Sequence, residues 1–227
     1  MIPKSASKTT LDPQIDAFLK SNHSYSLSSN PQLNAQNLTP ALIYIHEAAT
    51  LLEQATNSKM DAKFWLKAGV QVYLVEYRLA PEWQYPTQLD EWRKGERDVD
   101  PDLVFGGGDS AAGNMTAALS LRLRDEGKRA MAGLFLLYPE PMLPFGTSAA
   151  TENNRGLYLN CESSCQVDAT IFPPAYRRRR FIYRQVSPVS NLKDLPAAAV
   201  YTCGFDCLRD VGVEFASKLE EAGNQVT

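Results

Sequence analysis

The chain has 227 residues, 44% hydrophobic and 22% charged, the composition of a globular protein that can bury a sizeable core. With 23 basic and 26 acidic residues the formal charge is −3, which argues against a nucleic-acid binder, whose phosphate contacts need a basic excess. The longest apolar runs are too short to cross a bilayer, and no apolar segment follows Lys4 as in a secretory signal. We therefore expect no membrane span and a cytoplasmic location.

Apolar, β-rich runs alternate with helical patterns along most of the chain. In order, the sequence predicts a strand over 41–45, a helix over 52–67, strands over 70–75 and 103–105, a helix over 112–125, strands over 134–138 and 197–202, and a helix over 210–222. Strands separated by helices imply a mainly parallel sheet, so the predicted fold class is α/β.

Two stretches fall outside this alternation. Residues 21–40 are rich in Ser, Asn, Gln and Pro and are predicted to be a loop. Residues 140–191 have no clear period, and an insertion of this length is typical of a functional lid. The arginine run 177–180 within it is interpreted as a solvated face, with a phosphate or acidic partner as the alternative.

Four cysteines form two C-x3-C pairs, Cys161 with Cys165 and Cys203 with Cys207. Zinc ribbons normally use the tighter C-x2-C spacing, and the chain is neither short nor visibly secreted. We therefore expect free, reduced thiols and no metal site.

The sharpest chemical signal is the segment 106–113, Gly-Gly-Gly-Asp-Ser-Ala-Ala-Gly, between a predicted strand and a predicted helix. In a nucleophile elbow the serine occupies a strained turn there, and small residues two positions before and after it let strand and helix approach. Gly108 and Ala112 hold these positions around Ser110. At the helix N-terminus, the backbone N–H of Ala111 can stabilise an oxyanion.

Nucleotide binding is the weaker interpretation of the same glycines. Gly106, Gly108 and Ala111 match a loose dinucleotide fingerprint, but that fingerprint needs an acidic residue at the end of the next strand. Glu126 has the right separation, yet it lies at the end of the predicted helix.

Three motifs occur in the order found in the hormone-sensitive-lipase-like α/β-hydrolases: Tyr-Arg-Leu-Ala-Pro-Glu at 77–82, Gly-Asp-Ser-Ala at 108–111 and Gly-Phe-Asp-Cys-Leu-Arg-Asp at 204–210. The chain resembles this esterase family from about Leu11 onward. The resemblance implies that Ser110 is the nucleophile and Asp206 the acid of a catalytic triad, with no cofactor. Taken alone, Asp206 would be interpreted as a turn or N-cap residue before the last helix, and the matching flanking residues favour the triad instead.

The same resemblance divides the chain into a partial N-terminal cap or loop, 1–40, and an α/β-hydrolase core, 41–227, whose insertion 140–191 contributes to a small cap. It implies an oxyanion hole formed by the N–H groups of Glu47, Ala48 and Ala111. His46, Gly108 and Asp109 are the motif residues that order the surrounding loops.

The chain departs from the family pattern in two places. The oxyanion motif His-Gly-Gly-Gly is replaced by His-Glu-Ala-Ala at 46–49. Both histidines, His23 and His46, precede Ser110, and none follows Asp206, where the family has its base. We therefore expect a truncated or degenerate member in which the C-terminal strand and helix are missing and activity is impaired.

The sequence thus predicts a serine carboxylic-ester hydrolase acting on small, short-acyl esters. The alternative is a catalytically silent α/β-hydrolase homologue that binds small molecules, as the receptor-like members of this family do. The oligomeric state is not predicted.

Overall fold

The computed structural model describes residues 40–45, 70–75, 77–78, 82–83, 87, 103–128, 130–141, 146–154, 159, 161 and 188–227. The expected helix over 52–67, nearly all of the predicted cap 1–40 and most of the insertion 140–191 lie outside these residues. They stay predictions.

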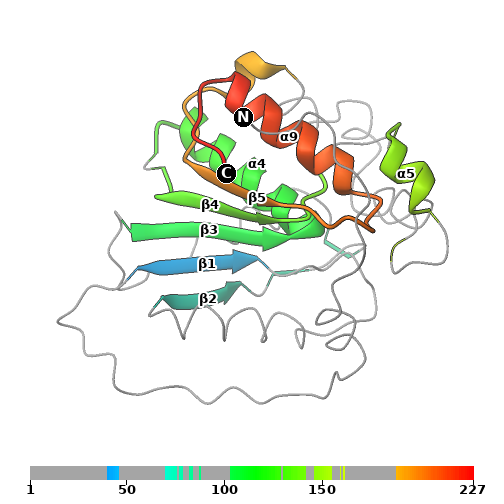
Figure 1. Cartoon of the computed structure of the whole chain (residues 1–227). Helices are drawn as coiled ribbons and strands as arrows, with labels where there is room; N and C mark the ends of the chain where they lie inside the picture. The colour runs from blue at the N-terminus through cyan, green and yellow to red at the C-terminus, as the bar shows by residue number, and fades with distance from the viewer. Residues whose placement is uncertain are drawn as a thin grey trace.

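The described strands form one parallel sheet of five strands in the order β2-β1-β3-β4-β5 (Figure 1). They are β1 (Ala41–Ile45), β2 (Gln71–Val75), β3 (Val104–Asp109), β4 (Gly133–Leu137) and β5 (Ala198–Tyr201). The predicted α/β class with a mainly parallel sheet is confirmed.

The predicted end of β3 was wrong. The strand was predicted to end at Phe105, because glycine is a poor strand former. In the structure it continues through three glycines to Asp109. β3 is an inner strand that pairs with β1 on one side and β4 on the other, and the glycines are buried there. Pairing on both sides outweighs the weak local propensity.

Two long helices lie on the same face of the sheet, α4 (Ser110–Asp125) and α9 (Arg209–Glu221) (Figure 1). They share one core with β4 and β5, in which Leu119, Leu136, Phe215 and Leu219 are at most 1% exposed. Val211, Phe215 and Leu219, spaced four residues apart along α9, lie on its buried face.

Shorter elements were not predicted from the sequence. The helix α5 (Ser148–Glu152) lies in the insertion without a clear period, and the 3-10 helix η2 (Val189–Leu192) spans the end of that insertion. At the other end of the chain, Gln225–Thr227 run beside the outer edge of β5, with Ala198 N donating to Gln225 O at 2.9 Å and Thr227 N to Ala198 O at 3.0 Å. Within the described parts, no helix is long and apolar enough to cross a membrane.

The strand order places a switch point between β1 and β3. From β1 the chain goes outward to β2 on one side, and then returns to β3 on the other side. Ile45 at the end of β1 pairs with Gly108, and Leu137 at the end of β4 pairs with both Asp109 and Tyr201. The carboxyl ends of these strands are therefore level, and ligands of open α/β sheets bind at such an edge.

Candidate active site

Ser110 stands at a sharp turn between β3 and α4. It is the first residue of the helix, directly after the last residue of the strand, and has φ 51°. A left-handed backbone costs an L-residue about 1–2 kcal/mol, so the serine is strained. Its relative exposure is 6%. The tight strand-to-helix turn matches the geometry that the glycine-rich segment predicts.

The strand and the helix touch at Gly108. A Cβ atom on this residue would lie 2.5 Å from the carbonyl oxygen of Ala112, a backbone atom that cannot yield without moving the helix. The Thr116 hydroxyl lies 3.1 Å from Gly107 O and 2.9 Å from Ala112 O, and so bridges strand and helix. This close contact holds the strained turn in place.

The first turn of α4 offers backbone N–H groups beside Ser110. The N-cap residue, Asp109, makes no side-chain cap hydrogen bond, and the first turn contains no acidic residue. Tyr44 Oη donates to Asp109 Oδ1 at 3.2 Å and holds this carboxylate toward β1. The Ala111 N–H therefore has the location of an oxyanion donor, where the helix dipole favours negative charge. His46, Glu47 and Ala48 lie outside the described residues.

Asp206 is in the loop that follows β5. Its Oδ1 accepts a hydrogen bond from Leu208 N at 2.9 Å, so the residue also forms the turn that the alternative interpretation expected. The N-cap of α9 is Leu208, not Asp206. Burial raises the pKa of Asp206, and hydrogen bonds from the Leu208 N–H and the Cys207 thiol offset this only in part.

Ser110 and Asp206 both follow strands whose carboxyl ends lie at the same edge of the sheet. β4 separates their strands, which corresponds to two strand spacings, or roughly 10 Å. Among the described residues none hydrogen-bonds the Ser110 hydroxyl. A triad at this edge thus needs a base between the two side chains, and both histidines lie outside the described part of the chain.

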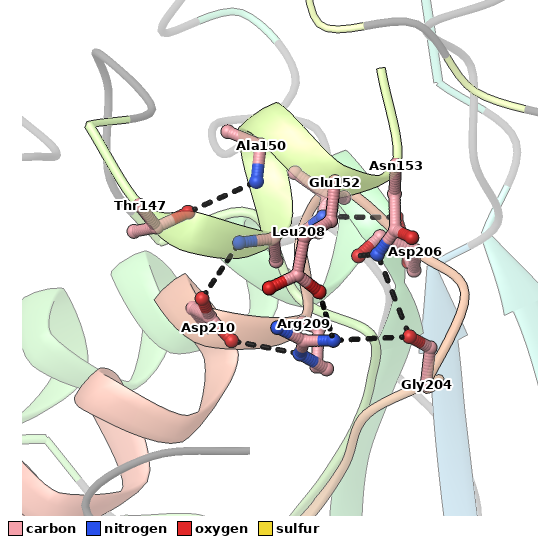
Figure 2. A network of polar contacts seen from close by, with 10 residues as sticks. Thr147, Ala150, Glu152, Asn153, Gly204, Asp206, Leu208, Arg209 and Asp210 are labelled. Carbon is pink, nitrogen blue, oxygen red and sulfur yellow. Dashed lines mark hydrogen bonds and ion pairs between the residues drawn. The ribbon is translucent and has the colours of Figure 1, made fainter. Parts of the chain in front are cut away.

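A polar network fixes the loop that carries Asp206 (Figure 2). Asn153, just after α5, donates through Nδ2 to the carbonyl oxygens of Asp206 at 2.9 Å and Gly204 at 3.4 Å. Arg209 adds a third contact, from Nη1 to Gly204 O at 3.3 Å. The main chain on either side of Phe205 is therefore held from two directions.

Arg209 is the centre of this network, with a side chain that is 2% exposed. It pairs with Asp210 at 2.8 Å and with Glu152 at 3.2 Å, and Asp210 Oδ2 in turn accepts from Ala149 N at 2.8 Å. Burial alone would raise the pKa of Asp210, but the hydrogen bonds and charge of Arg209 together with the Ala149 N–H lower it. The network joins α5 to the start of α9.

Sequence reasoning missed both supporting residues. Arg209 lies inside the motif 204–210 that carried the family resemblance, so its position was visible although its role was not. Asn153 lies in the insertion without a period, and no local signal marks it. Its importance comes from a contact across 53 positions of sequence.

The cysteines of the described part, Cys161, Cys203 and Cys207, are free thiols. In that same part of the chain no group of three or more His, Cys, Asp or Glu side chains could hold a metal ion. Cys165 is not among the described residues.

A parallel sheet with a strained serine between an inner strand and a helix defines an α/β-hydrolase core. Residues 42–227 match the family model described as the alpha/beta hydrolase fold, and the chain belongs to this family, in its hormone-sensitive-lipase-like branch. The serine, the acid and the glycine of the turn all lie within the matched range.

Several similar proteins are named as esterases. An arylesterase of Saccharolobus solfataricus is 30% identical over 164 residues, which cover 67% of this chain and 52% of the relative. The esterase LipI of Mycobacterium tuberculosis is 27% identical over 208 residues, 85% of this chain and 63% of the relative. Among solved structures, a fungal esterase of Rhizomucor miehei superposes with a TM-score of 0.78 at 27% identity, covering 87% of this chain and 65% of that one. The chain thus spans between about half and two thirds of these relatives.

Proposed function

We propose that the protein is a serine carboxylic-ester hydrolase acting on small, short-acyl esters. The observation that carries the proposal is the left-handed Ser110, φ 51°, at the strand-to-helix turn of a chain with several relatives that are named esterases. Strain of this kind persists only where the surroundings hold it, and it is typical of functional residues.

In this proposal Ser110 Oγ attacks the acyl carbon and Asp206 orients the base. The oxyanion is stabilised by the N–H groups of Ala111, Glu47 and Ala48, of which the first lies at the start of a helix of 16 residues. His46, Gly108 and Asp109 order the loops around these groups. No metal or organic cofactor takes part in this chemistry. The names of the relatives favour hydrolysis over the silent, receptor-like alternative.

The direct test is hydrolysis of p-nitrophenyl acetate by the purified 227-residue chain, compared with Ser110→Ala. We expect turnover that depends on Ser110 but is slow, well below the usual range of roughly 1–10³ s⁻¹, because a serine without its general base keeps only residual catalysis. Equal rates for the two proteins would refute the assignment of Ser110. A rate inside the usual range would instead show that one of the two histidines serves as the base.

Chemical rescue sharpens this test. Free imidazole can take the proton from Ser110 when no side chain does so, and the turnover of the unaltered chain should then rise with imidazole concentration. Imidazole also hydrolyses the ester by itself, so the rate measured with Ser110→Ala is subtracted. A fluorophosphonate probe, which forms a Ser Oγ–P bond and releases fluoride, should label one site and leave Ser110→Ala unlabelled.

The cytoplasmic location is part of the same proposal and is tested by fractionation of cells that express the tagged chain. The substrate class is tested with a series of p-nitrophenyl esters of increasing acyl length, in which activity should fall as the acyl chain grows.

A further inference from the structure

Cys161 and Cys207 lie in contact although 46 positions separate them in sequence. Cys207 has 0% exposure and forms a small apolar cluster with Leu208 and Val211, against which Leu159 and the half-buried Cys161 pack. Each thiol lies near enough to the other to shift its pKa. The sulfur atoms are therefore already neighbours in the folded chain.

The backbone of Cys161 is anchored in this position. Its N–H donates to Asn154 Oδ1 at 3.2 Å, and its thiol lies 3.7 Å from the carbonyl oxygen of Ala150 in α5. Cys207 is equally fixed, since it stands between Asp206 and Leu208, which are joined by a hydrogen bond of 2.9 Å. Two anchored thiols in contact need little rearrangement to form a bond of about 2.05 Å.

We propose that Cys161 and Cys207 are a dithiol site that a low-molecular-weight disulfide, such as glutathione disulfide, converts into an intramolecular disulfide. The Cys161 thiolate attacks one sulfur of the oxidant, forms a mixed disulfide and releases one equivalent of oxidant thiolate. The Cys207 thiolate then attacks Cys161 Sγ and expels the second equivalent. The two cysteines lose two protons and two electrons, and the oxidant leaves as two thiols.

The burial of the two residues sets the order of the steps. Cys161 is half-buried, so a dissolved oxidant can reach it, whereas Cys207 is fully buried and is out of reach of such an oxidant. Burial is the main cause that raises the pKa of both thiols, and the negative charge of the neighbouring Asp206 carboxylate raises both pKa values further. The site is therefore sluggish near neutral pH, unlike the low-pKa thiols of redox catalysts.

Oxidation also changes the surroundings of Asp206. In the reduced chain the neighbouring S–H of Cys207 is one of the groups that lower the pKa of this carboxyl group. A disulfide has no S–H, so this donor is lost, and the new bond ties Cys161 to the loop that holds Asp206. The site itself is defined by thiol chemistry, and its test is independent of ester hydrolysis.

Peptide mapping tests the pairing. Trypsin leaves Cys161 and Cys165 together in peptide 156–177, and Cys203 and Cys207 together in peptide 194–209. In the double variant Cys165→Ser/Cys203→Ser each peptide keeps one cysteine, so a cross-linked pair of peptides has one possible identity. The protein is treated with glutathione disulfide at about pH 8.5, near the pKa of a free thiol, alkylated and digested.

We expect most of the double variant to yield the 156–177/194–209 cross-link, which dithiothreitol reverses. Adding Cys207→Ser should leave glutathione on Cys161, and adding Cys161→Ser should leave Cys207 unmodified. If circular dichroism shows a folded double variant with both cysteines free, or with glutathione on Cys161 and no cross-link, the proposal is refuted. If this variant does not fold, fragmentation of the cross-linked peptides from the unaltered chain decides, and any pairing other than Cys161–Cys207 refutes it.

Discussion

Replacing Arg209 by Met tests whether the network around the Asp206 loop depends on one buried cation. The substitution keeps much of the apolar stem and removes the guanidinium, which is 2% exposed. Asp210, 17% exposed, would then keep only the Ala149 N–H, and Gly204 O would lose its bond from Nη1.

The size of the stability loss depends on how well the carboxylate of Asp210 is solvated once its partner Arg209 is removed. Removing one partner of a buried ion pair costs roughly 3–5 kcal/mol, and because Asp210 is partly exposed we expect the lower end, about 3 kcal/mol. In a chain of this size that corresponds to a loss in Tm of roughly 6–12 °C. Glu152→Gln is the matched control, because the Glu152 side chain is 45% exposed and its pair is worth less than about 1 kcal/mol.

Urea unfolding followed by circular dichroism measures both variants. The Asp210 pKa is lowered in the folded chain, so its ion pair stabilises above the ordinary value of 3.8 and is lost as pH falls through the lower folded pKa. The difference between the unaltered chain and Arg209→Met should therefore shrink below about pH 4. A loss no larger than that of Glu152→Gln would refute the argument.

Three further predictions concern the turn and the acid. At Ser110, where φ is 51°, the glycine variant should be more stable than the alanine variant by about 0.5–1 kcal/mol. At Ser120, within α4, the alanine variant should be the more stable of the two. The same order at both positions would contradict backbone strain at Ser110. Gly108→Ala should lower the free energy of unfolding by at least about 2 kcal/mol, because the new Cβ would lie 2.5 Å from Ala112 O. Gly146→Ala, whose Cβ would have no atom within 4 Å, should change it by no more than about 0.5 kcal/mol. Equal unfolding midpoints for the two variants would contradict the close contact at Gly108. Burial raises the pKa of Asp206, so the folded chain loses stability as the pH rises from 3.8 through the folded pKa. Asp206→Asn should therefore be at least as stable as the unaltered chain at pH 7, and any gain in stability should vanish below about pH 3.8. A variant that is less stable than the unaltered chain at pH 7 would contradict a raised pKa.

Most of the sheet was predictable because its strands are short apolar runs whose burial is visible in the sequence. The prediction for β1, 41–45, coincides with the strand, and the predicted β5 exceeds the observed strand by one residue at each end. β3 was predicted too short because its last four residues, 106–109, are three glycines and an aspartate. They are extended only because β1 and β4 pair with them, and no local rule contains that information.

In the candidate site, too, local features could be predicted from the sequence and tertiary contacts could not. The turn at Ser110 is a local structure, fixed by small residues two positions away, and a short sequence motif can therefore reveal it. The support of Asp206 is tertiary, since its carbonyl oxygen accepts from Asn153, which follows α5 and lies 53 positions earlier in a segment without a clear period. A motif predicted where the acid lies, but not what holds its loop.

The two candidate catalytic residues both lower the stability of the fold, and the residues around them compensate. Ser110 is held in a left-handed backbone, and Asp206 is a carboxylate whose ionised form is disfavoured by burial. Against these costs stand the contact at Gly108, the Thr116 bridge and the buried Arg209. Substitutions of Ser110 or Asp206 should therefore stabilise the chain while abolishing the proposed hydrolysis, whereas substitutions of the supporting residues should weaken both together. Measuring the free energy of unfolding and the Ser110-dependent turnover on the same variants separates these two classes of substitution. A variant of a supporting residue that keeps full turnover after its free energy of unfolding falls by several kcal/mol would show that the lost contact does not position the site.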